Sequence, residues 1–225
     1  PTITVTDENG KTYTATVTLK VEPKQLTGLG IDLASTWVYK ETKTPTLKGV
    51  EGLTPDDYAI TYSKKDNSEN YGNIMPILVG EYKATLSITN PNYTASEASV
   101  NFEITPIDTE VKVKSYDAEF TYDGSEHTKN AYDVLWANNA SPVADNKLPN
   151  GDLVTAEITG KVRDVKDTAL ENNTIGKITI TNADGVDVTN CYSNIKKSAG
   201  KLTVNPIPTP IVVTAGSDTK EYDGT

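Results

Sequence analysis

Hydrophobic and polar residues alternate in short runs along most of this chain. In residues 13–22 every second position is apolar or aromatic, and threonine or a charged residue fills the positions between. Similar runs occupy residues 81–88, 98–105 and 200–205. A period of two is typical of a β-strand with one buried face. The buried face of the first run is expected to consist of Tyr13, Ala15, Val17, Leu19 and Val21.

Turn signals separate these runs. Asn9-Gly10 lies between two alternating segments and predicts a β-hairpin, because this pair accepts the positive φ angles of a tight turn. Residues 148–152, Leu-Pro-Asn-Gly-Asp, predict another turn. Residues 54–58 predict a short helical turn, with Thr54 as its cap and Pro55 at its first position. Longer segments have no helical pattern, so the sequence predicts an all-β chain.

A proline-to-tyrosine spacing recurs along the chain. Three alternating runs end in similar tripeptides that close on Pro23, Pro106 and Pro206. A tyrosine lies 16 positions after each proline: Tyr39, Tyr122 and Tyr222. The intervals between the prolines differ, at 83 and 100 residues, so the chain is not a solenoid of constant period. The spacing indicates modules that share a frame but differ in their insertions.

The frame divides the chain into four parts. Residues 1–23 are expected to be the C-terminal hairpin of a preceding module, and residues 207–225 the first strand of a following one. Residues 24–106 and 107–206 are expected to be complete modules. Their size and short strands predict tandem immunoglobulin-like β-sandwiches, with β-grasp-like sheets as the alternative. We expect both end segments to pair with sheet edges of an adjacent module or a neighbouring chain, where unpaired strands find partners.

Charge and composition narrow the classes of partner. The net charge of −10 disfavours nucleic acid, which is bound through Lys and Arg on its phosphates. It disfavours anionic lipid for the same reason. No run approaches the ~20 apolar residues of a membrane span, so we expect no direct membrane insertion of this segment. The single cysteine, Cys191, cannot form an intrachain disulfide and is expected to be a small buried hydrophobe.

Four stretches of the second module resemble a known kind of repeat. They are FTYDGSEHT at residues 120–128, LPNGDLVTAEITG at 148–160, GKITITNADGVDVTNCY at 176–192 and AGKLTVNP at 199–206. In this order they resemble the YDG/MBG-type repeats of large bacterial surface proteins. The resemblance covers residues 107–206 well, residues 24–106 more loosely, and residues 207–225 only as a start.

The resemblance carries expectations about markers and function. Such repeats often open near a Tyr-Asp-Gly turn, represented by Tyr122, Asp123, Gly124, Tyr222, Asp223 and Gly224. After Tyr39, Lys40-Glu41 replaces Asp-Gly. The family implies tandem extracellular modules at the bacterial cell surface that form a stalk or an adhesive region. Its implied partners are neighbouring modules and a host glycan, mucin or protein.

Catalytic residue types are scarce. His127 is the only histidine, Ser125 is too near it in sequence to be an obvious partner, and Cys191 stands alone. Because nucleophilic catalysis needs a nucleophile, a base and an orienting group, the sequence predicts no enzyme and no catalytic residue. His127 is expected to be hydrogen-bonded near the Tyr-Asp-Gly turn.

Calcium is the only metal for which the sequence offers candidates. Asp184, Asp187 and Asn190 recur at three-residue spacing in a turn-rich stretch. Two further clusters hold oxygen ligands: Asp66, Asn67, Glu69 and Asn70 in one, and Asp164 and Asp167 in the other. Calcium takes six to eight oxygens, and no single loop here supplies them. We therefore expect no cofactor, with calcium as a weak alternative.

A covalent cross-link is a further hypothesis. Lys112 or Lys114 in an early strand and Asn205 in the last strand could form an isopeptide bond. That chemistry needs an unprotonated lysine, so the lysine would have to be buried.

Two tryptophans admit two interpretations. Trp37 and Trp136 could form a platform for a sugar, or they could pack in the core. We expect both to be core residues.

Overall fold

The chain folds into two compact units, each described by itself. The computed structural model describes residues 1–224, and its units are Pro1–Thr105 (unit 1) and Pro106–Thr225 (unit 2). Nearly all regular structure is β, and the helical elements are short 3-10 turns. Several sheets form an all-β, sandwich-type fold. None of the described residues forms a helix long and apolar enough to cross a membrane.

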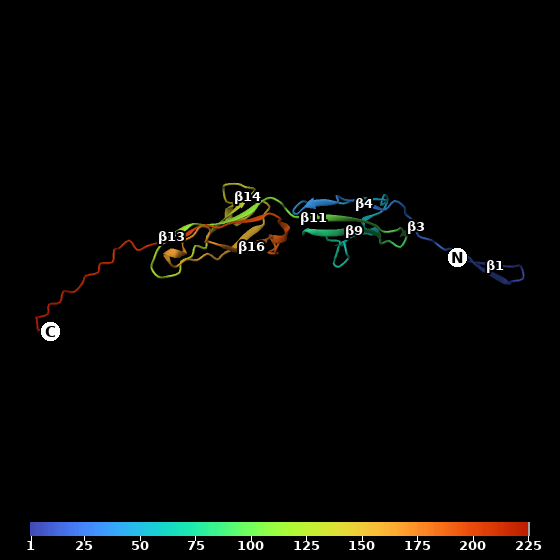
Figure 1. Ribbon diagram of the computed structural model, residues 1–225. Helices are drawn as coiled ribbons and strands as arrows, with labels where there is room; N and C mark the ends of the chain where they lie inside the picture. Colours follow the sequence, from blue (N-terminus) through green and yellow to red (C-terminus); the bar gives the residue numbers. More distant parts are fainter. Residues whose placement is uncertain (225) are drawn as a thin grey trace. The chain divides into compact units, whose positions relative to one another are not determined.

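Unit 1 is built around a five-stranded sheet with the order β5-β11-β9-β7-β8. Two smaller sheets, β4-β6 and β10-β3, and a separate amino-terminal hairpin also belong to this unit (Figure 1). Its strands after the hairpin are β3 (Lys24–Gln25), β4 (Gly30–Asp32), β5 (Thr36–Val38), β6 (Thr46–Lys48), β7 (Tyr58–Lys64), β8 (Asn70–Gly72), β9 (Gly80–Ile88), β10 (Tyr93–Thr94) and β11 (Ala98–Thr105).

Aromatic residues fill the core of unit 1. Tyr82 and Leu86 of β9 are buried, as are Phe102 and Ile104 of β11, so the alternation predicted for these strands is confirmed. The Trp37 ring stacks on Phe102, with 4.9 Å between ring centroids and 11° between planes. Parallel stacking of large rings adds to the area that they remove from water.

Unit 2 has shorter sheets: β14-β12-β17, β13-β18 and β15-β16. Its strands are β12 (Val111–Ser115), β13 (Ala118–Thr121), β14 (Tyr132–Trp136), β15 (Leu153–Ile158), β16 (Ile175–Thr181), β17 (Ile195–Ser198) and β18 (Leu202–Asn205). Its core is mainly aliphatic. Fully or nearly fully buried residues include Val111, Val113, Val134, Val154, Ile180, Leu202 and Val204.

The two units share a scheme of strand pairing. The antiparallel pairs β4–β6 and β7–β9 of unit 1 have counterparts in β12–β14 and β15–β16 of unit 2. The parallel pairs β3–β10 and β5–β11 have counterparts in β12–β17 and β13–β18. In each unit an early strand therefore runs parallel to a closing strand.

The register of the closing pair is the same in both units. Trp37 pairs with Ile104, and Phe120 pairs with Val204. In each case the first residue lies 14 positions after the preceding boundary proline, and its partner lies two before the next. The recurring proline-to-tyrosine spacing thus corresponds to a repeated strand register.

The amino-terminal hairpin forms as predicted, but its buried face does not. β1 (Thr2–Thr6) pairs with β2 (Thr12–Thr16) across a turn in which Gly10 has φ +81°. Tyr13 and Val17 are about half exposed, and Leu19 and Val21 are 75% and 89% exposed. The expectation of a buried face over residues 13–22 was wrong, because alternation reports a strand-like pattern and not the presence of a covering sheet.

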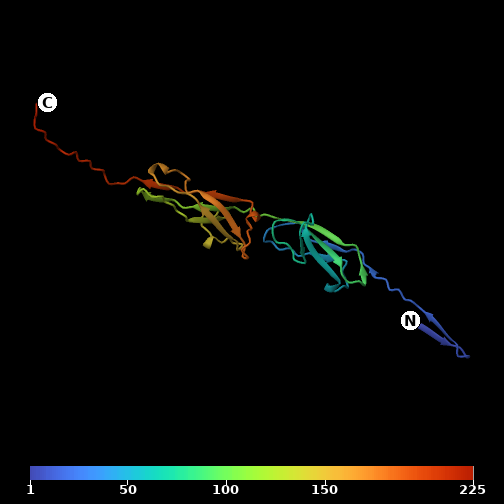
Figure 2. The same ribbon diagram turned by 90° about the horizontal axis from the view of Figure 1, so that it is seen from below.

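The expected pairing of the end segments was also wrong within this chain. Residues 206–224 form no strand, as the red end of the ribbon shows in Figure 2, and their side chains are exposed. In the described residues β1 and β2 pair only with each other. A strand needs a ladder partner to satisfy its backbone groups, so the first strand expected in residues 207–225 does not form alone.

The predicted turns are confirmed. Pro55–Asp57 forms a 3-10 turn (η1), and the Thr54 amide and hydroxyl both donate to the Asp57 carboxylate, at 2.7 and 2.9 Å. In the Leu-Pro-Asn-Gly-Asp segment, the Gly151 amide donates to the Leu148 carbonyl at 2.9 Å.

Candidate functional site at the Tyr122 loop

The Tyr122 loop, defined as residues 122–127, follows β13 and contains the Tyr-Asp-Gly marker. The Tyr122 amide donates to the Asn205 carbonyl at 2.8 Å, which extends the β13–β18 ladder by one bond. Gly124 has φ +81°, and an added Cβ there would meet nothing within 4 Å. The turn therefore requires glycine for its backbone angle and not for space.

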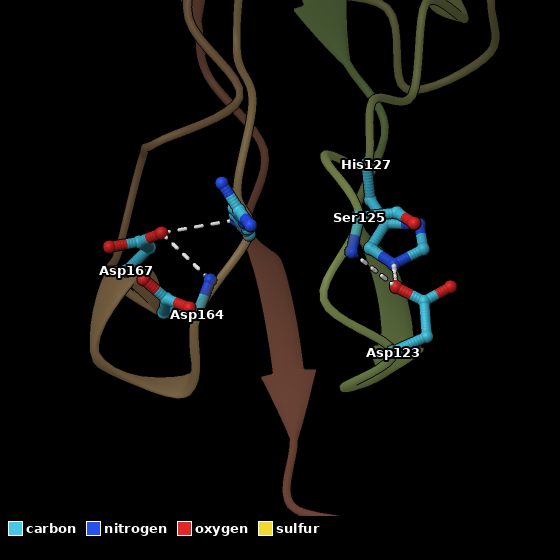
Figure 3. A network of polar contacts seen from close by, with 6 residues as sticks. Asp123, Ser125, His127, Asp164 and Asp167 are labelled. Atoms are coloured by element: carbon cyan, nitrogen blue, oxygen red, sulfur yellow. Dashed lines mark hydrogen bonds and ion pairs between the residues drawn. The ribbon is translucent and has the colours of Figure 1, made fainter.

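The Asp123 carboxylate organises this loop. Its Oδ1 accepts the Ser125 amide at 2.8 Å and lies 3.0 Å from His127 Nε2 (Figure 3). Donation from the Ser125 amide, with a smaller contribution from His127, lowers the pKa of Asp123 below its usual value. A carboxylate that accepts a backbone amide two residues on forms an Asx turn. Asp123 thus acts first as a turn residue.

His127 contacts Phe120 and Val162 in addition to Asp123. Its ring stacks on Phe120 with 4.5 Å between centroids and 11° between planes. Its backbone forms two hydrogen bonds with Val162, at 2.7 and 3.0 Å. The prediction that His127 is hydrogen-bonded near the Tyr-Asp-Gly turn is confirmed.

A second turn lies beside the Tyr122 loop because of the His127–Val162 pairing. It contains η3 (Val165–Asp167), and the Asp167 carboxylate accepts the amides of Arg163 at 3.0 Å and Asp164 at 2.9 Å (Figure 3). These two bonds lower the pKa of Asp167. Two calcium candidates, Asp164 and Asp167, therefore take part in capping a turn.

Asp123, Ser125 and His127 are not arranged in the order of a catalytic triad for acyl transfer. Catalytic triads place an imidazole between a nucleophile and a carboxylate. Here Asp123 contacts both other groups, and Ser125 takes part through its backbone amide. The described contacts stabilise two adjacent turns at the end of the β13–β18 ladder.

The equivalent position of unit 1 keeps the backbone bond but changes the loop. The Tyr39 amide donates to the Thr105 carbonyl at 2.9 Å, as Tyr122 does to Asn205. Lys40 then has φ +74°, and the Glu41 amide donates to the Val38 carbonyl. The Tyr39 side chain is 3% exposed, compared with 36% for Tyr122. The marker tyrosines therefore share a backbone role and differ in burial.

The third Tyr-Asp-Gly marker, residues 222–224, does not follow a strand. Tyr222 is 93% exposed, and Gly224 has φ +78°. The Lys220 ammonium lies 3.1 Å from the Asp223 carboxylate. The Tyr-Asp-Gly sequence thus adopts a positive glycine φ even where no ladder is formed.

Of the calcium candidates Asp184, Asp187 and Asn190, Asp187 caps a turn with its carboxylate. The Asp187 carboxylate accepts the Thr189 amide at 3.0 Å and its hydroxyl at 2.6 Å, which lowers the Asp187 pKa. The Asp184 amide donates to Asn182, and the Asn190 side chain accepts the Cys191 thiol. No group of three or more His, Cys, Asp or Glu in the described residues is placed to hold a metal. Calcium binding stays an untested hypothesis.

The burial needed for the proposed isopeptide bond is not met. Lys114 and Asn205 are exposed, and Lys112 is paired at 2.8 Å with Glu110. β12 pairs with β14 and β17, and β18 pairs with β13. The isopeptide hypothesis was wrong in its physical premise, because neither lysine is removed from water.

The tryptophans differ in burial. Trp37 is 5% exposed and belongs to the core of unit 1. Trp136 is half-buried and meets Tyr192 edge to face, with 6.4 Å between centroids. The expectation of a core residue is confirmed for Trp37 and only partly for Trp136.

Buried polar residues in unit 2 were not found from the sequence. Asp152 is fully buried and accepts the Tyr192 hydroxyl at 2.8 Å, and Asn150 donates to that hydroxyl at 2.7 Å. This contact links the Asn-Gly-Asp turn to the tyrosine that precedes β17. The fully buried Cys191, next to it, matches the expectation of a small buried hydrophobe.

Asn173 forms a second buried network. Its side-chain amide donates to the carbonyls of Tyr116 at 2.8 Å and Lys129 at 3.0 Å. The Ser115 hydroxyl donates to the Asn173 carbonyl at 2.5 Å and accepts the Gly200 amide at 2.9 Å. Asn173 lies two residues before β16 and has no pattern in the sequence that would have identified it.

Unit 1 carries an open depression on its surface. Its volume is about 630 Å³, and it is lined by Lys64, Lys65, Asp66, Ser68 and Glu81. The Lys64 ammonium lies 4.5 Å from the centroid of the Tyr82 ring. This cation–π contact holds the Lys64 ammonium beside a ring that is itself buried in the core.

The sequence was compared with protein-family models and with curated proteins. No protein-family model matches the chain. No curated protein matches it either.

Proposed function

We propose that this chain is a non-enzymatic spacer segment of an extracellular bacterial surface protein. The observation that carries the proposal is the repeated register of the closing strands, with its Tyr39–Thr105 and Tyr122–Asn205 hydrogen bonds. The resemblance of residues 107–206 to surface-protein repeats supports the location. A spacer needs repeated units that fold alike, and needs no cavity or reactive group.

The strand pairing is suited to bearing tension. In both units an early strand runs parallel to the closing strand. A pull on the chain before the early strand and after the closing strand loads this ladder in shear. All hydrogen bonds of a sheared ladder resist together, whereas an unzipped ladder yields one bond at a time. Forced unfolding is governed by the rate of unfolding, which this loading direction slows.

Single-molecule stretching tests this function. The chain, held through handles at residues 1 and 225, should unfold in two separate force peaks of comparable contour length. Unit 2 should resist the greater force, because its β13–β18 ladder covers Leu202–Asn205 and that of unit 1 covers Glu103–Thr105. As a control, force is applied between adjacent ends of β15 and β16. This antiparallel pair is then unzipped one hydrogen bond at a time and should yield at lower force. Unfolding without a resolved peak in either unit contradicts the spacer proposal.

A second candidate function is adhesion to a host glycan, mucin or protein. The depression of unit 1 favours it, because Lys64, Lys65 and Glu81 place opposite charges around an open surface. Lys65 is paired with Glu81 at 2.5 Å, so a ligand carboxylate would compete for the same ammonium group.

An array of neutral and acidic glycans tests the adhesive alternative. Binding of acidic glycans that is lost in Lys64→Ala and Lys65→Ala, and kept in Lys166→Ala, would support it. Lys166 is a suitable control because it is also a lysine, its side chain is 80% exposed, and it does not line the depression. Absence of binding to every glycan would remove the glycan-binding form of this alternative.

A further inference from the structure

We propose that Asn150 is a deamidation site that the fold of unit 2 keeps closed and that unfolding of this unit opens. The reaction is an attack by a backbone amide on the asparagine side chain, and its product disfavours refolding. The state of Asn150 therefore records whether unit 2 has been unfolded. The inference goes beyond the spacer function and does not depend on it.

The sequence supplies the reactive pair of residues. In an Asn-Gly pair the amide that follows the asparagine is poorly shielded, because glycine has no side chain. The chain contains two such pairs, Asn9-Gly10 and Asn150-Gly151. The second pair lies in the Leu-Pro-Asn-Gly-Asp turn of unit 2, shortly before β15.

The reaction needs only water as a co-reactant. The Gly151 amide nitrogen loses its proton and bonds to Cγ of Asn150, the Cγ–Nδ2 bond breaks, and Nδ2 leaves as ammonia. The product of this step is a cyclic imide. Water then opens the ring at either carbonyl and yields aspartate or isoaspartate, so a neutral amide becomes a carboxylate.

In the folded unit both reacting groups are engaged elsewhere. The Gly151 amide donates to the Leu148 carbonyl at 2.9 Å, so its hydrogen is directed into the turn. The Asn150 side-chain amide donates to the Tyr192 hydroxyl at 2.7 Å, and its Oδ1 accepts the Asp152 amide at 3.2 Å. The reaction requires the nitrogen and Cγ to reach an attack geometry. The turn must open before that geometry can form.

Buried neighbours hold the Asn150 side chain in this orientation. Tyr192 is 5% exposed, and its hydroxyl donates to the carboxylate of the fully buried Asp152 at 2.8 Å. Since the hydroxyl proton is used on Asp152, the hydroxyl can only accept from Asn150, and the amide nitrogen must be the donor. An asparagine fits this position, and an aspartate does not.

Deamidation makes this network repulsive. A carboxylate at position 150 has no proton to donate to Tyr192, and one hydroxyl proton cannot be donated to two carboxylates. The new charge would share the hydroxyl with buried Asp152, and like charges repel strongly where water is excluded. Isoaspartate also adds a methylene carbon to the backbone of the turn. Unit 2 of the modified chain is therefore expected to refold poorly, while unit 1 is unaffected.

Peptide mapping by mass spectrometry tests whether the fold controls the reaction. The intact chain is kept at mildly alkaline pH with and without guanidinium chloride, and a gain of about 1 Da at Asn150 is followed with time. Asn150 should react at least about tenfold more slowly without denaturant, because the reaction requires opening of unit 2. Asn9 supplies a reference rate in denaturant, where the two pairs should react alike. Equal Asn150 rates in the folded and unfolded chains overturn the proposal.

Substitution of Tyr192 tests what holds the site closed. Tyr192→Phe removes the acceptor for Asn150 and should raise the rate without denaturant severalfold. Tyr116→Phe is the matched control, because the Tyr116 hydroxyl donates to Asp133 at an exposed site of the same unit. If unit 2 of Tyr192→Phe does not fold, as circular dichroism would show, its rate should equal that in denaturant, which again supports control by the fold. An unchanged rate contradicts the role of this hydroxyl.

The variant Asn150→Asp tests the consequence for refolding. It should raise the unfolding equilibrium constant of unit 2 at least about tenfold and leave unit 1 unchanged. Asn182→Asp is the matched control, because Asn182 Oδ1 accepts the amides of Asp184 at 3.0 Å and Val186 at 2.9 Å, as a carboxylate also can. Equal stability of Asn150→Asp and the parent chain in a denaturant titration contradicts the proposed effect on refolding.

Discussion

Units 1 and 2 share a strand register but are stabilised by different chemistry. Unit 1 stacks aromatic rings, with Phe102 in contact with Trp37 and Tyr82 at centroid distances of 4.9 and 5.4 Å. Unit 2 buries aliphatic residues and two polar networks centred on Asp152 and Asn173. The comparison teaches that the ladder between early and closing strands is the common feature, and that core composition and loop chemistry vary around it.

The largest expected effect is a loss of stability that is confined to the aromatic core of unit 1. Phe102→Ala should destabilise unit 1 by about 3–5 kcal/mol, because it removes a buried ring and leaves a cavity. Calorimetry should show the unit 1 transition moving to lower temperature while the unit 2 transition stays in place. Leu170→Ala, at an exposed loop position, is the control and should move neither. A joint shift of both transitions would show that the units do not unfold independently.

Loss of a buried amide should affect only unit 2. Asn173→Ala removes the donors to the carbonyls of Tyr116 and Lys129, at a total cost of about 1–3 kcal/mol because both bonds are only partly buried. Urea unfolding followed by tyrosine and tryptophan fluorescence measures the change. Asn139→Ala, at an exposed site, is the matched control. An unchanged unit 2 midpoint would contradict a stabilising role for this network.

Removing a glycine from one marker loop and introducing one into the other should change the free energy of unfolding in opposite directions. Gly124→Ala places a Cβ at φ +81° and should destabilise unit 2 by about 1–2 kcal/mol. Lys40 already has φ +74°, so Lys40→Gly should relieve strain and stabilise unit 1 by up to about 1 kcal/mol. Thermal unfolding of both variants measures the difference. Effects of the same sign would contradict the assignment of backbone strain to these positions.

The smallest expected effect is a response to acid at the Tyr122 loop. The pKa of Asp123 is lowered, so its contribution to folding is complete above the usual value of 3.8 and is lost as the pH falls through the lower folded value. The amide resonance of Ser125 should titrate with a midpoint below 3.8, and Asp123→Asn should abolish the titration. Unit 1 uses Lys40 and Glu41 at this place, so its Glu41 amide serves as the comparison. A Ser125 midpoint above 3.8 would contradict the hydrogen bond to Asp123.

Much of the local structure could be predicted because it depends on neighbouring residues. Period-two alternation identified β9, β11 and β18, and turn chemistry identified Gly10, Thr54 and Gly151. The tyrosine spacing located Tyr39 and Tyr122, whose amides form equivalent bonds. These features follow from side-chain spacing and backbone angles, which a single sequence displays directly.

Features that depend on distant contacts could not be predicted. The alternation of residues 13–22 resembles that of β11, yet one run is exposed and the other is buried, because burial requires a covering sheet. Asp152 and Asn173 carry no local pattern, since their partners lie far away in sequence. The closing pairs are also parallel, and alternation alone does not distinguish parallel from antiparallel strands.

Hydrogen exchange at the marker tyrosines tests the shared register most directly. In the intact chain the amides of Tyr39 and Tyr122 should both be strongly protected, each by its bond to the residue before a boundary proline. The Tyr222 amide, in the exposed residues that follow Pro206, should exchange at the rate of an unfolded peptide. Rapid exchange at either Tyr39 or Tyr122 would contradict the claim that both units close through the same strand pairing.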